Sequence, residues 1–66
     1  MVLKVIEILA SSPKSWEDAA ANAVSEASKS VRGIRSINIS NQSAIVEDGT
    51  IVEYRINCKI SFEIER

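Results

Sequence analysis

The strongest constraint on the fold is a strict alternation of apolar and polar side chains over residues 52 to 64. Every second residue is apolar: Val52, Tyr54, Ile56, Cys58, Ile60, Phe62 and Ile64. A period of two places these residues on one face of a β-strand and the intervening polar residues on the other. The segment therefore predicts a strand on the order of 45 Å long with one face to bury.

Two further strands are expected upstream. Residues 2 to 9 are rich in β-branched and other apolar types, and in residues 34 to 46 Ile37 and Ile39 alternate with polar residues. A bend is expected near Asn41 and Gln42. The Asp48-Gly49 pair is favoured in tight hairpins, so the chain is expected to reverse there into the last strand.

A helix is predicted between the first two strands. Ser15 is followed three residues later by Asp18, which is close to a capping box. The apolar positions then recur at spacings of three and four, as on one face of a helix, and they are Trp16, Ala19, Ala20, Ala23, Val24, Ala27 and Val31. Gly33 is a plausible C-terminal stop, which predicts a helix of about 17 residues, roughly 25 Å long.

This helix is too short to cover the apolar face of the last strand. The whole chain has 66 residues, and a domain of this size buries only about 60% of its unfolded surface. One cysteine and no histidine exclude an internal disulfide and a Cys/His zinc site, which leaves oligomerisation as the means of stabilisation. We predict a single α+β domain over residues 1-66, β-α-β-β in order, whose three-stranded antiparallel sheet has the C-terminal strand in the middle and wraps around one helix.

Composition argues against several functional classes. Eight basic and nine acidic residues give a net charge of −1, so no broad basic surface for nucleic acid is expected. No apolar run approaches the ~20 residues that span a bilayer, and no signal peptide is recognisable, so we expect a cytoplasmic protein without a membrane partner. There is no Ser/His pair, glycine-rich phosphate loop or metal triad, and Cys58 is expected to be a buried hydrophobe. An enzyme is therefore not expected.

Several motifs, in this order and spacing, resemble the dodecin family across the whole chain. They are the M-V-x-K opening, the S-S-P-K-S-W-E-D-A-A-A helix entry, the alanine-rich helix, the strand after Gly33 and the closing Y-R-I-N-C-K-I-S-F-E-I. The resemblance implies a hollow homododecamer of β-α-β-β subunits. That implication agrees with the apolar surface that one helix leaves uncovered.

The resemblance also bears on ligands. Many dodecins stack paired flavins on a tryptophan of the second strand and bond them through a glutamine of the third; the matching positions here are Ser36 and Arg55. Serine offers no ring to stack on, so binding of riboflavin or FMN is expected to be weakened. Arg55 offers a fork of donors to an anionic ligand. Ser36, Asn38, Arg55 and Asn57 are expected to share the polar face of the sheet, either as solvated surface or as the wall of a ligand pocket.

A second branch of the family lacks the stacking tryptophan, has a similar S-W-E-x-A-A-A segment and has been called calcium dodecin; this chain resembles that branch more. Trp16 lies on the predicted helix, where packing or a subunit contact is expected of it. Calcium needs six to eight oxygen ligands, and no contiguous loop here supplies them. Carboxylates gathered by symmetry are the remaining source: Glu17, Asp18, Glu47, Asp48, Glu53, Glu63 and Glu65.

Two hypotheses follow from these observations. The first is a shell that binds and stores a small ligand at subunit contacts, against the face containing Ser36, Asn38, Arg55 and Asn57. The alternative is a dodecamer that binds calcium or another cation, or is purely structural, without flavin.

Overall fold

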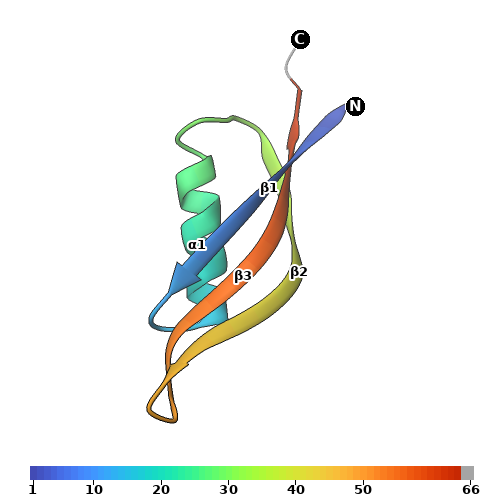
Figure 1. The fold of residues 1–66 in the computed structure, drawn as a ribbon. Helices are drawn as coiled ribbons and strands as arrows, with labels where there is room; N and C mark the ends of the chain where they lie inside the picture. Colours follow the sequence, from blue (N-terminus) through green and yellow to red (C-terminus); the bar gives the residue numbers. More distant parts are fainter. Residues whose placement is uncertain (65–66) are drawn as a thin grey trace.

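The computed structural model describes residues 1–64 and has the predicted β-α-β-β order. Its elements are β1 (Leu3–Ser12), α1 (Trp16–Ala27), β2 (Ile34–Glu47) and β3 (Thr50–Glu63). The sheet is antiparallel with the order β1-β3-β2, so the C-terminal strand lies in the middle as predicted. The sheet curves around α1, which lies against one of its faces (Figure 1). We call the face turned away from α1 the outer face.

The start of α1 is fixed by serines on both sides of Pro13. Ser15 is the N-cap, and its Oγ accepts a hydrogen bond of 2.9 Å from the backbone N–H of Asp18. The buried Ser12 donates its hydroxyl to Asp18 Oδ2 at 2.6 Å and accepts the N–H of Lys14 at 2.9 Å. The predicted N-terminal cap is thus confirmed, and the carboxylate of Asp18 anchors the helix to the end of β1.

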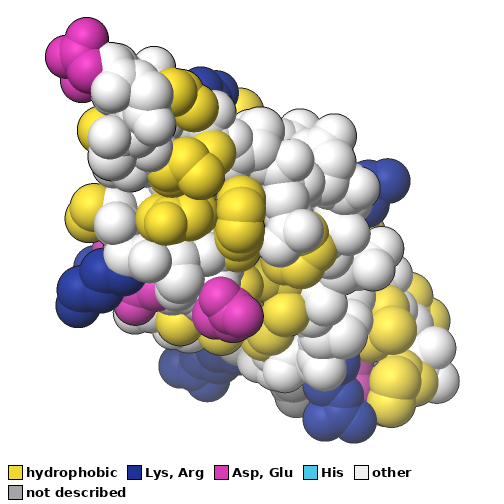
Figure 2. Space-filling model, turned by 90° about the horizontal axis from the view of Figure 1, so that it is seen from below, with side chains coloured by type: hydrophobic (Ala, Val, Ile, Leu, Met, Phe, Trp, Pro, Cys, Tyr) yellow, Lys and Arg dark blue, Asp and Glu magenta, His cyan; other side chains and the backbone are white. Residues whose placement is uncertain are grey.

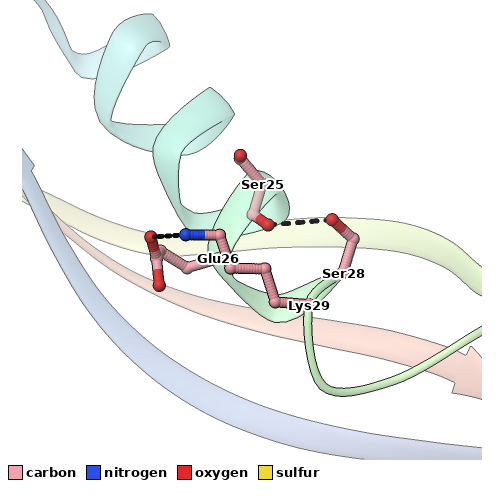
Figure 3. Close-up of polar contacts among 4 residues, drawn as sticks. All are labelled: Ser25, Glu26, Ser28 and Lys29. Carbon is pink, nitrogen blue, oxygen red and sulfur yellow. Dashed lines mark hydrogen bonds and ion pairs between the residues drawn. The ribbon is translucent and has the colours of Figure 1, made fainter.

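The end of α1 differs from the prediction, because the helix stops at Ala27 and has 12 residues. The next N–H groups bond to the carbonyl three residues earlier, as in a 3₁₀ turn. Lys29 donates to the Glu26 carbonyl and Ser30 to the Ala27 carbonyl. The Ser28 hydroxyl donates to the Ser25 carbonyl at 2.8 Å, and Lys29 forms an ion pair with Glu26 (Figure 3). These local bonds satisfy the end of the helix before the apolar spacing runs out, so Val31 packs against the core from a loop.

The β2–β3 turn uses the predicted Asp-Gly pair. Asp48 has a φ of 51° and Gly49 a φ of 75°, which is the combination required by a type I′ turn. A register shift between Ile39 and Asn41 interrupts the pairing of β2 with β3 next to the position where a bend was expected, and such shifts bend a strand. β1 extends beyond its predicted end because Ser11 and Ser12 still pair with Arg55 and Tyr54. β3 begins before its predicted start because Thr50 and Ile51 pair with Glu47 and Val46.

The core lies where α1 crosses the middle of the sheet. Three helix residues and three β3 residues are buried there: Ala19, Ala23, Ala27, Ile56, Cys58 and Ile60. Alanine side chains let the helix backbone approach the sheet closely, and larger residues of β1 and β2 pack around this centre.

Both ends of the sheet project beyond the helix. Twelve helical residues span roughly 18 Å, whereas fourteen strand residues span about 46 Å. Val52 and Ile64, at opposite ends of the alternation, are 40% and 43% exposed, and the molecule measures 51 × 19 × 13 Å. Viewed from the hairpin end, hydrophobic side chains gather into patches on the surface (Figure 2). Within residues 1–64 no helix is long and apolar enough to cross a membrane.

Candidate ligand-binding face

The outer face carries all four polar residues singled out from the sequence. Ser36 pairs with Ser61 and Asn38 with Lys59, while Arg55 and Asn57 of β3 pair with residues of both neighbouring strands. Directly opposed residues of antiparallel strands share a face, and so do alternate residues of one strand. The ligand-binding role of these residues stays a prediction.

The register separates Ser36 from Arg55. Ser36 is opposite Ser61, which is six positions along β3 from Arg55, or about 20 Å. One small ligand bound to one chain therefore cannot contact both side chains. A site that uses both residues requires a second copy of the chain.

Ser36 is engaged by its neighbour on β3. Its Oγ lies 2.5 Å from the Oγ of Ser61, a hydrogen bond in which either hydroxyl can donate. The position that matches the stacking tryptophan of flavin-binding dodecins therefore presents a small pair of hydroxyls and no aromatic surface.

The opposite end of the outer face contains a shallow pocket of about 140 Å³. It lies between β1 and β3, and its lining residues are Leu9, Ala10, Ser11, Arg55, Ile56 and Asn57. Arg55 and Asn57 were singled out from the sequence, whereas Leu9 and Ser11 were not. They are recognised only from the antiparallel register of β1 on β3 in the structure, which pairs Leu9 with Asn57 and Ser11 with Arg55.

The outer face is less polar than expected along β1. Leu3, Val5 and Leu9 pair with outer-face residues of β3, and all three are exposed. The apolar residues at odd positions of the first strand predict an apolar outer face. The prediction was missed because Lys4 and Glu7 fall on opposite faces, so neither face reads as wholly apolar. Leu3 and Val5 are neighbours on this face of an edge strand, and such exposed apolar residues indicate a surface that a partner covers.

Trp16 has the packing role expected of it. Its indole Nε1 donates a hydrogen bond of 2.9 Å to the backbone carbonyl of Ser43 on β2. Its ring meets the ring of Tyr54 edge-on, with centroids 4.8 Å apart and an interplanar angle of 78°. Trp16 thus ties the start of α1 to β2 and β3 on the inner face, away from Ser36.

Cys58 is fully buried at the centre of the core. Burial raises the pKa of its thiol above the usual value, because the desolvated thiolate is disfavoured. A raised thiol pKa opposes nucleophilic or metal-binding use, since both need the thiolate.

The carboxylates proposed as calcium ligands are scattered within one chain. Asp18 is held by Ser12, and Glu63 lies 3.9 Å from Arg35. Glu65 lies outside the described residues. In residues 1–64 no three of the His, Cys, Asp and Glu side chains are grouped closely enough to hold a metal ion. A site with enough oxygen ligands must therefore draw on more than one chain.

Comparison with known proteins gives consistent matches. The family model described as Dodecin matches residues 2–65. The curated protein "Calcium dodecin" of Mycobacterium tuberculosis is 43% identical over 63 residues, which cover 96% of this chain and 89% of that protein.

Solved structures agree with this assignment. A dodecin structure from Streptomyces coelicolor superposes with a TM-score of 0.93 at 26% identity, covering 98% of this chain and 93% of that one. The crystal structure of calcium dodecin from M. tuberculosis, described as a calcium-chelating antigen with a novel calcium-binding site, superposes with a TM-score of 0.84. It is 42% identical and the match covers 98% of this chain and 93% of the other.

Proposed function

Because this chain belongs to the dodecin family, we propose that it assembles into a hollow homododecamer that binds calcium and performs no catalysis. The observation that carries the proposal is the 43% identity, over nearly the whole chain, to a protein named for calcium. Ser36 in place of an aromatic ring favours the same branch of the family over the flavin-binding one.

The uncovered ends of the sheet support the assembly. Val52 and Ile64 continue the apolar face of β3 beyond the helix, and Leu3 and Val5 expose a second apolar surface on β1. These surfaces lie on opposite faces of the sheet, so a partner packed against one face cannot cover both. Contacts with several copies, as in a closed shell, can cover them.

The hairpin end supplies the carboxylates best suited to bind a shared cation. Among residues 1–64, no hydrogen bond or ion pair holds the side chains of Glu47, Asp48 or Glu53. Glu47 and Asp48 lie at the Asp48-Gly49 turn, which projects beyond the helix (Figure 1), and Glu53 lies further along β3, opposite Ile45. Hairpin ends of neighbouring subunits that meet at a symmetry axis supply several oxygen ligands at once.

Equilibrium dialysis of the purified assembly against radioactive calcium tests the proposal. We expect calcium to be retained, and we expect the double variant Asp48→Asn with Glu53→Gln to reduce retention. Asparagine tolerates the positive φ of position 48, so this variant keeps the turn. The matched control is Glu26→Gln, which removes a carboxylate that is already paired with Lys29.

Two results would contradict the proposal. A monomer in native mass measurement would show that the chain does not assemble into a shell. If the assembly retains no calcium, and a chelator changes neither its particle size nor its melting temperature, calcium binding is contradicted.

A second candidate function is a shell that holds a small ligand against the outer face. It is favoured by the pocket beside Arg55, whose guanidinium forms no hydrogen bond or ion pair within the described chain. Dialysis of the assembly against riboflavin and its phosphate tests the family's usual ligand. Retention near one flavin per chain supports flavin storage, and no retention at micromolar concentrations rules it out.

A further inference from the structure

We infer that the pocket between β1 and β3 binds a compact oxyanion, a carboxylate or phosphate group attached to a small apolar group. This inference deepens the second candidate function and rests on it, because it names the ligand class for that face. It concerns the end of the outer face that lies about 20 Å from Ser36.

The register arranges four side chains around the pocket as the corners of a rectangle. Leu9 faces Asn57 across the strands and Ser11 faces Arg55. Opposed Cβ atoms are about 5 Å apart, and alternate residues of a strand about 7 Å apart. Between these corners lie Ala10 and Ile56, which pair with each other and turn their side chains toward the helix. The floor of the pocket is therefore peptide backbone on a buried core.

Three of the four corners are able to donate hydrogen bonds. Arg55 presents a planar fork that matches the two oxygens of a carboxylate or phosphate, Asn57 presents an amide and Ser11 a hydroxyl. No hydrogen bond among residues 1–64 engages any of these three side chains. No carboxylate lines the pocket. Hydrogen-bond donors therefore line the pocket, and no acidic side chain among the lining residues repels an anion.

The fourth corner is apolar. Leu9 is 70% exposed next to the polar corners, and Glu7 separates it from Val5 on the same face of β1. A ligand that places its oxyanion on Arg55 and a short hydrocarbon group on Leu9 satisfies both kinds of corner. Leu9 thus favours an organic anion over an inorganic one.

The size of the pocket limits the ligand. A volume of about 140 Å³ equals roughly five water molecules at ~30 Å³ each. Pockets that enclose a drug-sized ligand measure about 300–1,000 Å³. The pocket therefore fits the acidic group of a ligand but not a flavin ring system.

The test is a titration of the intact assembly by isothermal calorimetry, with butyrate and inorganic phosphate as separate probes and no calcium present. Both anions are expected to bind, and butyrate more tightly. Arg55→Ala is expected to weaken both by about tenfold or more, which corresponds to ~1.4 kcal/mol. Leu9→Ala is expected to weaken butyrate only. The matched control is Lys59→Ala, which removes a cation from the same strand and face outside the pocket.

The outcomes separate this inference from the functions on which it builds. Arg55→Lys retains the charge without the fork, so affinity equal to that of the unmodified protein would reduce the site to a diffuse attraction and overturn the inference. Equal losses in Arg55→Ala and Lys59→Ala overturn it in the same way. If the assembly retains riboflavin but binds neither anion, the ligand-storing function stands and the oxyanion pocket falls. If the assembly binds neither riboflavin, butyrate nor phosphate, the ligand-storing function and the oxyanion pocket are both contradicted, and the calcium-binding proposal is unaffected.

Discussion

The middle of the sheet and its two ends have the same apolar alternation but opposite surroundings. Ile56, Cys58 and Ile60 are buried under α1, whereas Val52 and Ile64 of the same strand face are exposed. The difference arises because a helix residue advances about 1.5 Å and a strand residue about 3.3 Å, so twelve helical residues cover less than half of β3. A period-two pattern therefore identifies the face to be buried, while the length of the covering element decides how much of that face the chain buries by itself.

The middle is expected to be the most sensitive to truncation. Ile60→Ala removes a fully buried side chain and leaves a cavity in the core between α1 and the sheet, so we expect a loss of about 2–5 kcal/mol. Urea unfolding at a fixed protomer concentration measures it. Ile51→Ala, an exposed residue of the same strand, is expected to cost less than ~1 kcal/mol. Similar losses at both positions would mean that assembly buries the ends as thoroughly as α1 buries the middle.

The ends are expected to govern association. Val52→Asp places a charge on the exposed part of the apolar face, so the protomer fold should persist while subunit affinity falls by at least about tenfold, or ~1.4 kcal/mol. Sedimentation or native mass measurement over a dilution series detects it. Ser25→Asp adds the same charge to the exposed side of α1 as a control. A full-sized particle that resists dilution in Val52→Asp would show that this end is not an interface.

The start of the covering helix is expected to show an intermediate effect. Ser15→Ala removes the acceptor of the Asp18 N–H and is expected to cost about 0.5–2 kcal/mol. Thermal unfolding followed by circular dichroism measures it, with Ser25→Ala as the control on the same helix. No change in Ser15→Ala would indicate that the bond between Ser12 and Asp18 holds the helix start without the cap.

The end of the covering helix is expected to be nearly insensitive. Lys29→Ala breaks an ion pair with Glu26 whose side chains are 68% and 73% exposed, so we expect a change below ~0.5 kcal/mol. The same thermal scan, repeated at high salt, measures it. A larger loss would mean that another subunit buries this pair in the assembly.

Local patterns were sufficient to predict most of the fold. Ser15, Asp48 and Gly49 are recognisable cap and turn residues. The C-terminal strand in the middle was the simplest arrangement of the three strands, and the observed order agrees with it. The end of α1 was predicted wrongly because Val31 continues the helical spacing. Serine side chains at Ser28 and Ser30 offered no comparable signal, although the backbone turns there.

The candidate face was predicted in part. Periodicity placed Ser36 and Arg55 on one face, but their separation follows from the register of β2 on β3, including the shift after Ile39. Periodicity likewise left the pairing of Leu9 and Ser11 with β3 undetermined. The proposed cation site belongs to several chains at once, so no spacing within one sequence specifies it.

The contact between Trp16, Ser43 and Tyr54 also gives this protein an intrinsic fluorescence probe. Trp16 is the one tryptophan of the chain and Tyr54 the one tyrosine. Their rings are 4.8 Å apart, close enough for light absorbed by the phenol to be emitted by the indole. Since the indole is also bonded to β2, lifting the helix start from the sheet changes both the emission wavelength and the transferred signal. Folding, subunit exchange and helix docking can thus be followed in the unlabelled protein with a single emission spectrum.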